Sequence, residues 1–141
     1  MTRTCFDASA LAKTIVEEPG SDDANSAFAH AEEPIAPDWV VVELAQVLWK
    51  RSRRGEISGQ QAVDRLQAIG RLSLELLPTL GQTLPALELA LAHHHSVYDC
   101  LYVAVALSED ASLVTADVKL PNLARLLGVQ VTLLGAGRRV R

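Results

Sequence analysis

The sequence is poor in cysteine and has no long apolar run. Its 141 residues include two cysteines, Cys5 and Cys100. Two cysteines without a CxxC spacing exclude a disulfide-rich scaffold and favour the reducing cytoplasm. No stretch reaches about eighteen uninterrupted apolar residues, and the first residues lack a signal-peptide pattern, so we expect neither a membrane nor an exported protein. Internal repeats and long linkers are also absent, which favours one domain over residues 1–141.

Positive charge is also scarce overall. Thirteen Lys and Arg against seventeen Asp and Glu give a net charge of −4, which taken alone argues against a nucleic-acid partner. The charge is uneven, however, because residues 1–49 are strongly acidic and residues 50–141 carry an excess of bases. Most of those bases fall in two clusters, which are Lys50, Arg51, Arg53 and Arg54, and then Arg138, Arg139 and Arg141. The overall charge therefore leaves the question of partners open.

Short apolar runs alternate with helix-like periodicity along the chain. Strands are predicted near 4–6, 34–37, 72–77, 112–115 and 129–134, and helices over 8–17, 21–31, 38–54, 58–70, 80–93, 97–108 and 119–127. Asp38 is expected to cap the third helix, and Ser58 with Gln61 forms a capping box for the fourth. Strands separated by helices pair in parallel, so we predict an α/β fold, a three-layer α/β/α sandwich around a mostly parallel sheet.

Four carboxylates have neighbours that do not suit a solvated charge. Asp7 and Asp117 each follow a predicted strand, at the sheet edge where α/β proteins bind ligands. Glu43 and Asp99 each lie inside an apolar helix, with no Lys or Arg one turn away. An isolated buried carboxylate costs several kcal/mol unless it is paired, hydrogen-bonded or bound to metal. Their partners must therefore come from elsewhere in the chain or from a ligand.

If these four acids converge, their mutual repulsion requires a divalent cation. An all-oxygen carboxylate set is what Mg²⁺ or Mn²⁺ prefers, and Zn²⁺ is disfavoured. Four acids in one place do not resemble the two differentiated carboxyl groups of a glycosidase. The pattern favours hydrolysis of a phosphodiester with metal-activated water.

Simpler interpretations exist for each feature taken singly. An acid after a strand, such as Asp7 or Asp117, often caps a helix. His93, His94 and His95 point in directions about 100° apart, so we expect a solvated helix end in preference to a metal site, with His95 one turn from Asp99 and able to hydrogen-bond it. Bases at a helix C-terminus, as in the first basic cluster, are favoured by the helix dipole as well as by phosphate. The cysteines are expected to be small buried apolar residues.

Together these segments resemble a known family. Asp7-Ala8-Ser9 after a first strand, Glu43 in Val-Val-Val-Glu-Leu-Ala-Gln-Val-Leu, Tyr98-Asp99-Cys100-Leu101-Tyr102-Val103-Ala104 and Leu113-Val114-Thr115-Ala116-Asp117 are similar, in order and spacing, to PIN-domain ribonucleases, most closely VapC-type toxins. Cys100 stands where many relatives have Ala, and the three histidines are a local peculiarity. The resemblance implies a Mg²⁺ or Mn²⁺ site of Asp7, Glu43, Asp99 and Asp117, with Ser9 and Thr115 as supporting hydroxyls. It also implies a cognate antitoxin that binds near the acidic site.

The leading hypothesis is therefore a cytoplasmic, metal-dependent endoribonuclease toxin, with RNA contacts expected from Lys50, Arg51, Arg53 and Arg54. The alternative is a PIN-like domain that acts in RNA processing, or one that binds RNA or a partner without catalysis. A haloacid-dehalogenase-type phosphatase is disfavoured because Ser9 stands where a second Asp is needed, and a receiver domain because no Lys follows the last strand. Helices that are apolar on more than one face favour a homodimer.

Overall fold

The computed structural model describes residues 2–135, so Arg138, Arg139 and Arg141 lie outside the described residues. The strands are β1 (Arg3–Phe6), β2 (Glu33–Pro37), β3 (Glu75–Leu77), β4 (Ser112–Thr115) and β5 (Val131–Leu133). The helices are α1 (Ala8–Ile15), α2 (Ser21–His30), α3 (Trp39–Arg53), α4 (Gly59–Ile69), α5 (Thr83–His93), α6 (Val97–Ser108) and α7 (Leu120–Leu126), with a short 3₁₀ helix, η1 (Leu80–Gln82). Within residues 2–135, no helix combines the length and apolarity needed to cross a membrane.

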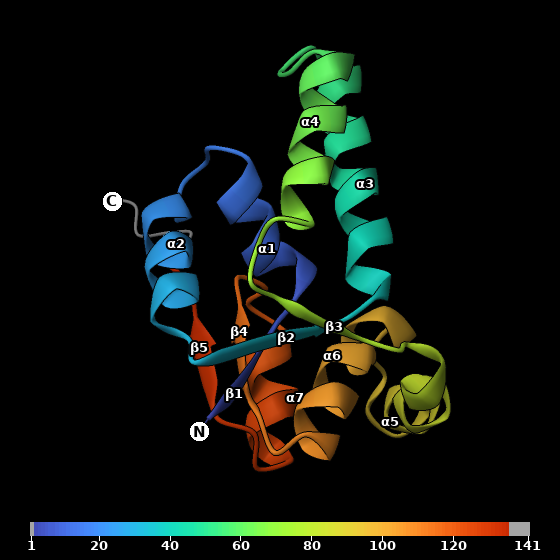
Figure 1. The fold of residues 1–141 in the computed structure, drawn as a ribbon. Helices are drawn as coiled ribbons and strands as arrows, with labels where there is room; N and C mark the ends of the chain where they lie inside the picture. The colour runs from blue at the N-terminus through green and yellow to red at the C-terminus, as the bar shows by residue number, and fades with distance from the viewer. Residues whose placement is uncertain (1, 136–141) are drawn as a thin grey trace.

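The five strands form one parallel sheet in the order β3-β2-β1-β4-β5. The chain moves from β1 outward to β2 and β3, and then returns across the sheet to β4 and β5. Because parallel crossovers are right-handed, this reversal places α1–α4 on one face and α5–α7 on the other. Figure 1 shows the two helix layers, with α3 and α4 projecting as a pair from the body. The predicted three-layer α/β/α sandwich is confirmed.

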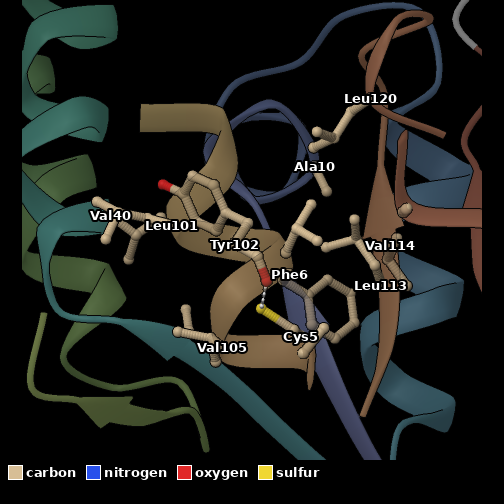
Figure 2. Close-up of a cluster of buried hydrophobic side chains, with 14 of the residues drawn as sticks. Cys5, Phe6, Ala10, Val40, Leu101, Tyr102, Val105, Leu113, Val114 and Leu120 are labelled. Carbon is tan, nitrogen blue, oxygen red and sulfur yellow. Dashed lines mark hydrogen bonds between the residues drawn. The ribbon is translucent and has the colours of Figure 1, made fainter. Parts of the chain in front are cut away.

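Helix α6 forms the centre of the second helical layer. Every residue from Cys100 to Ala106 is buried, because this helix packs against β1, β2 and β4 and is covered by α5. Figure 2 shows Tyr102 of α6 lying across the core, where its backbone carbonyl accepts a hydrogen bond from the Cys5 thiol. Both cysteines are free and buried, as expected for small apolar residues.

Two sequence predictions were wrong in detail. The third strand covers only Glu75–Leu77, because Leu72 and Leu74 pack against the core without joining the sheet. Asp38 precedes α3 but makes no capping bond to it. Its carboxylate accepts instead from the backbone N–H and hydroxyl of Thr79, which follows β3, at 3.1 and 2.6 Å. The capping box of Ser58 and Gln61 is confirmed.

Candidate active site

The carboxyl ends of β1 and β4 lie side by side at the point where the strand order reverses. Phe6 pairs with Val114, so Asp7 after β1 lies next to Thr115 at the end of β4. The connections from these strands cover opposite faces of the sheet, and the crevice between such connections is where open α/β sheets bind ligands. The sequence predicts Asp7 and Asp117 at this edge of the sheet. Because β1 and β4 are neighbouring strands, both residues lie at the same part of that edge.

Asp7 is held by three donors. It is 4% exposed, and it accepts from the Ser9 hydroxyl at 2.7 Å, from the Ala10 backbone N–H at 2.9 Å and from the Thr115 hydroxyl. Asp7 therefore does cap α1, but capping accounts for only one of its three hydrogen bonds. Burial raises its pKa to about 6, against the lowering effect of the hydrogen bonds, and the charge of Asp117 raises it further. A cation at this carboxylate would favour its ionised form.

Ser9 and Thr115 connect the two strand ends. The Ser9 hydroxyl accepts from the backbone N–H of Ala116 at 2.8 Å, and the Thr115 hydroxyl accepts from that of Asp117 at 3.0 Å. Each hydroxyl thus accepts a hydrogen bond from the loop after β4 and donates one to the Asp7 carboxylate. The structure places both of these residues, predicted as supporting hydroxyls, where they orient the Asp7 carboxylate.

Glu43 lies on α3, and its side chain extends toward the same strand ends. Helices α3 and α6 cover opposite faces of the sheet. The half-buried Glu43 carboxylate accepts a hydrogen bond from the Tyr102 hydroxyl of α6. Burial raises the pKa of Glu43, the Tyr102 hydrogen bond lowers it, and the charges of Asp7 and Asp99 raise it again. Sequence reasoning missed Tyr102 as a site residue. The available signal was its position three residues after Asp99, which places both side chains on one side of α6.

Asp99 lies in the first turn of α6, which Ser96 caps by accepting from the Asp99 backbone N–H at 3.1 Å. Burial raises the pKa of Asp99, and the charge of Asp117 adds to this effect. A hydrogen bond between the Ser96 and Asp99 side chains and the nearby positive charges of His95 and Lys119 lower it.

The four acids therefore act on one another. Asp117 perturbs both Asp7 and Asp99, and Glu43 responds to the charges of Asp7 and Asp99. Side chains from four separate segments of the chain thus form one electrostatic cluster, which we call the acidic cluster: Asp7, Glu43, Asp99 and Asp117.

The donor chemistry of the acidic cluster suits a hard divalent cation. Carboxylate and hydroxyl oxygens are the ligands that Mg²⁺ and Mn²⁺ prefer, and mutually repelling carboxylates are stabilised by such an ion. In the described part of the chain, no group of three or more Asp, Glu, His or Cys side chains forms a ready-made metal site. The four-carboxylate metal site therefore stays a prediction.

A cleft of about 560 Å³ opens beside the acidic cluster. It is lined by Ala8, Ser9, Ala12, Trp39, Val42, Glu43, Gln46, Val47, Lys50 and Tyr98. The cleft is thus bounded by α1, α3 and the start of α6, and both Glu43 and Ser9 line it.

The first basic cluster divides into two kinds of residue. Lys50 lines the cleft. Arg51 forms ion pairs with Glu18 and Glu56, and Arg54 also pairs with Glu56. The Arg53 guanidinium lies over the ring of Trp49, 5.1 Å from its centroid. Of these four bases, Lys50 is therefore the one placed beside the acidic cluster.

The three consecutive histidines end a helix, as expected. His93 is the last residue of α5, and His94 is its C-cap with a left-handed backbone (φ 58°). Of the three histidines, only His95 affects the acidic cluster, because its positive charge lowers the pKa of Asp99.

Comparison with known proteins agrees with this fold. The PIN domain family model matches residues 4–126. The chain belongs to the PIN-domain family. This PIN domain is 35% identical to Ribonuclease VapC3 of Pyrobaculum aerophilum over 116 residues, which cover 81% of this chain and 88% of the relative.

Solved structures share the fold of this PIN domain. VapBC2 from Rickettsia felis, crystallised with a DNA fragment from its promoter, aligns with a TM-score of 0.68 and 17% identity over 94% of this chain and 99% of that chain. A toxin-antitoxin complex from Klebsiella pneumoniae aligns with a TM-score of 0.61 and 13% identity over 84% of this chain and 89% of that chain. The resemblance found in the sequence motifs is thereby confirmed at the level of family and fold.

Proposed function

We propose that this PIN-domain protein is a metal-dependent endoribonuclease that acts as the toxin of a toxin–antitoxin pair in the cytoplasm. The observation that carries the proposal is the acidic cluster, because its four carboxylates come from separate segments of the chain, act on one another through their charges, and include Glu43, which lines a cleft. The similarity to Ribonuclease VapC3 over most of both chains supports RNA as the substrate.

In this proposal the four acids hold Mg²⁺ or Mn²⁺, and the surrounding residues keep the acids in place. Such an ion, when bound, lowers the pKa of water and offsets negative charge on the phosphate. Asp7 is oriented by Ser9 and Thr115, so its carboxylate needs little rearrangement on binding. Glu43 is oriented by Tyr102 from across the crevice. No side chain needs to act as a nucleophile, because water attacks the phosphodiester.

Cleavage of a labelled single-stranded RNA tests the activity. We expect cleavage with Mg²⁺ or Mn²⁺, none with EDTA, and a loss of at least about a hundredfold in Asp7→Asn and Asp99→Asn. Asp22→Asn provides a matched control, because Asp22 is an exposed acid on α2. Undiminished cleavage in EDTA or in both site variants would contradict the proposal.

The proposed partner is an antitoxin protein, as in the Klebsiella pneumoniae complex that shares the fold. Expression of the chain alone should then arrest growth, and co-expression of a small protein encoded beside it should relieve the arrest. Asp7→Asn should not arrest growth, although it should still bind that protein if binding does not need the carboxylate. A chain that binds metal and RNA without cleaving it would favour the alternative, a non-catalytic PIN-like module.

A further inference from the structure

Two aromatic rings are stacked at the wall of the cleft. The rings of Trp39 and Tyr98 are nearly parallel, at 6°, with centroids 5.7 Å apart. Trp39 is partly buried and packs against the core, while Tyr98 remains 56% exposed although Trp39 covers one of its faces. The backbone N–H of Trp39 also donates to the Thr79 hydroxyl at 2.9 Å, which anchors the start of α3. Tyr98 is therefore a rigidly backed ring with an open surface.

Helix α3 continues from this stack with one row of functional side chains. Trp39, Glu43, Gln46 and Lys50 are spaced by four, three and four residues, so they lie on one side of the helix, and all four line the cleft. The eleven residue steps from Trp39 to Lys50 extend about 16 Å along the helix. The row thus presents, in order, an aromatic surface, a carboxylate of the acidic cluster, an amide and a cation.

We propose that a nucleobase next to the scissile phosphate of single-stranded RNA stacks on the open face of Tyr98, with Trp39 as its support. This inference rests on the proposed ribonuclease function and names how its substrate is held. In this arrangement Gln46 offers both a donor and an acceptor to a base edge, and Lys50 contacts a phosphate of the same strand. The stacking residue selects unpaired nucleotides, because a base within a duplex has no free face.

The charge of the protein explains why stacking is needed. With a net charge of −4 and four carboxylates at the site, general attraction to the RNA backbone is weak. Of the first basic cluster only Lys50 lines the cleft, while Arg51 and Arg54 are engaged by Glu18 and Glu56. A stacked base contributes affinity without a positive charge. The cation at one end of the row favours a polyanion over an apolar peptide as the occupant.

Binding of a short fluorescent RNA, and of the same RNA with one base at a time removed to leave an abasic ribose, tests this inference. Affinities are measured in EDTA for each protein, and with Mg²⁺ in an Asp7→Asn background. We expect Tyr98→Ala to weaken binding about tenfold. Removal of one particular base should weaken wild-type binding by a similar factor and have no further effect in Tyr98→Ala, because the two changes remove the same contact.

Three variants separate stacking from other effects. Tyr98→Phe keeps the ring and should bind like wild type, whereas Tyr98→Leu keeps apolar bulk without the ring and should bind like Tyr98→Ala. Val63→Ala removes a similarly exposed apolar side chain, on α4 and outside the cleft, and should leave RNA affinity unchanged. Thermal unfolding confirms that each variant is folded.

The outcomes also separate this inference from the proposed function. Wild-type protein that cleaves RNA while Tyr98→Ala binds as well as wild type would overturn the stacking inference alone. Equal losses of RNA affinity at every abasic position would overturn it too. So would a Tyr98→Ala variant that binds a protein partner less tightly than wild type does but binds RNA equally well. Wild-type protein that neither binds nor cleaves RNA would overturn both.

Discussion

The Tyr102 hydroxyl donates a hydrogen bond to the Glu43 carboxylate, joining α6 to α3 across the crevice at the sheet edge. The Tyr102 ring is almost wholly buried among core side chains (Figure 2), so the position of its hydroxyl is set by packing. Burial, and then the charge of Glu43, raise the pKa of Tyr102 far above the physiological range. The hydroxyl therefore stays protonated and acts on Glu43 as a permanent donor.

Tyr102→Phe should impair the site and leave the fold nearly intact. Phe fills the same space, so we expect the free energy of unfolding to fall by only about 1 kcal/mol, while kcat/KM falls about tenfold or more because a hydrogen bond to a charged group is lost. Loss of this bond also raises the pKa of Glu43, so the acidic limb of the kcat/KM profile should move to higher pH.

The control for this variant is Tyr98→Phe, which removes an exposed tyrosine hydroxyl on the same helix. It should leave the pH profile unchanged. Calorimetric titration with Mn²⁺ adds a measurement independent of turnover, and we expect weaker binding in Tyr102→Phe. An unshifted profile together with unchanged Mn²⁺ affinity would show that Tyr102 only fills space.

Asp7→Asn should stabilise the metal-free protein at neutral pH although it abolishes cleavage. Burial raises the pKa of Asp7 from 3.8 to about 6, so the folded state holds a proton there that the unfolded state releases. The bound proton stabilises the folded state fully below about pH 4. This contribution to the free energy of unfolding, up to about 3 kcal/mol, is lost as pH rises through about 6. Asn carries no charge and avoids this loss.

Thermal unfolding in EDTA across pH 4–8 checks this prediction. The melting temperature of wild type should fall, relative to that of Asp7→Asn, as pH rises through 6, and the difference should disappear at the acidic end. Mg²⁺ or Mn²⁺ should restore stability to wild type more than to the variant. A variant less stable than wild type at pH 8 in EDTA would show that the hydrogen bonds of the ionised carboxylate outweigh its burial. Asp22→Asn serves as the control.

Lys50 and Arg51 are adjacent, but they should respond differently to replacement by Ala. Lys50 lines the cleft, so Lys50→Ala should weaken RNA binding, reduce the slope of log affinity against log salt by about 1 and leave stability unchanged. Arg51 pairs with Glu18, which also holds the nearly buried ammonium of Lys13 at 2.9 Å. Arg51→Ala should therefore lower the free energy of unfolding by about 1–2 kcal/mol in urea titrations. Similar losses of RNA affinity in both variants would contradict this division.

Exposed leucines on η1 and α5 should support self-association. Leu80, Leu84, Leu87 and Leu91 are all exposed, and Glu88 is the one Asp, Glu, Lys or Arg side chain on α5. We expect light scattering to show a dimer that Leu84→Lys converts to a monomer. Leu126→Lys, on α7, replaces a similarly exposed leucine and should keep the dimer. A wild-type monomer at high concentration would contradict the expectation.

Local sequence signals predicted most of the secondary structure and singled out the four acids. The capping box of Ser58 and Gln61 was recognisable because its effect acts within one helical turn. Glu43 and Asp99 stood out because their own helices are apolar. The prediction that Asp38 caps α3 was wrong, because its hydrogen-bond partner Thr79 lies 41 residues away in the sequence.

The sequence by itself determined the alternation of strands and helices, the PIN-like order of motifs and the identity of the acids, because each depends on neighbours within a few residues. The tertiary structure alone decided that β1 and β4 are adjacent, that Tyr102 reaches Glu43 and that Tyr98 stacks on Trp39. It also decided that Arg51 forms an ion pair within the fold, whereas Lys50 lines the cleft. These contacts join residues on different elements, and the packing of helices on both faces of the sheet creates them.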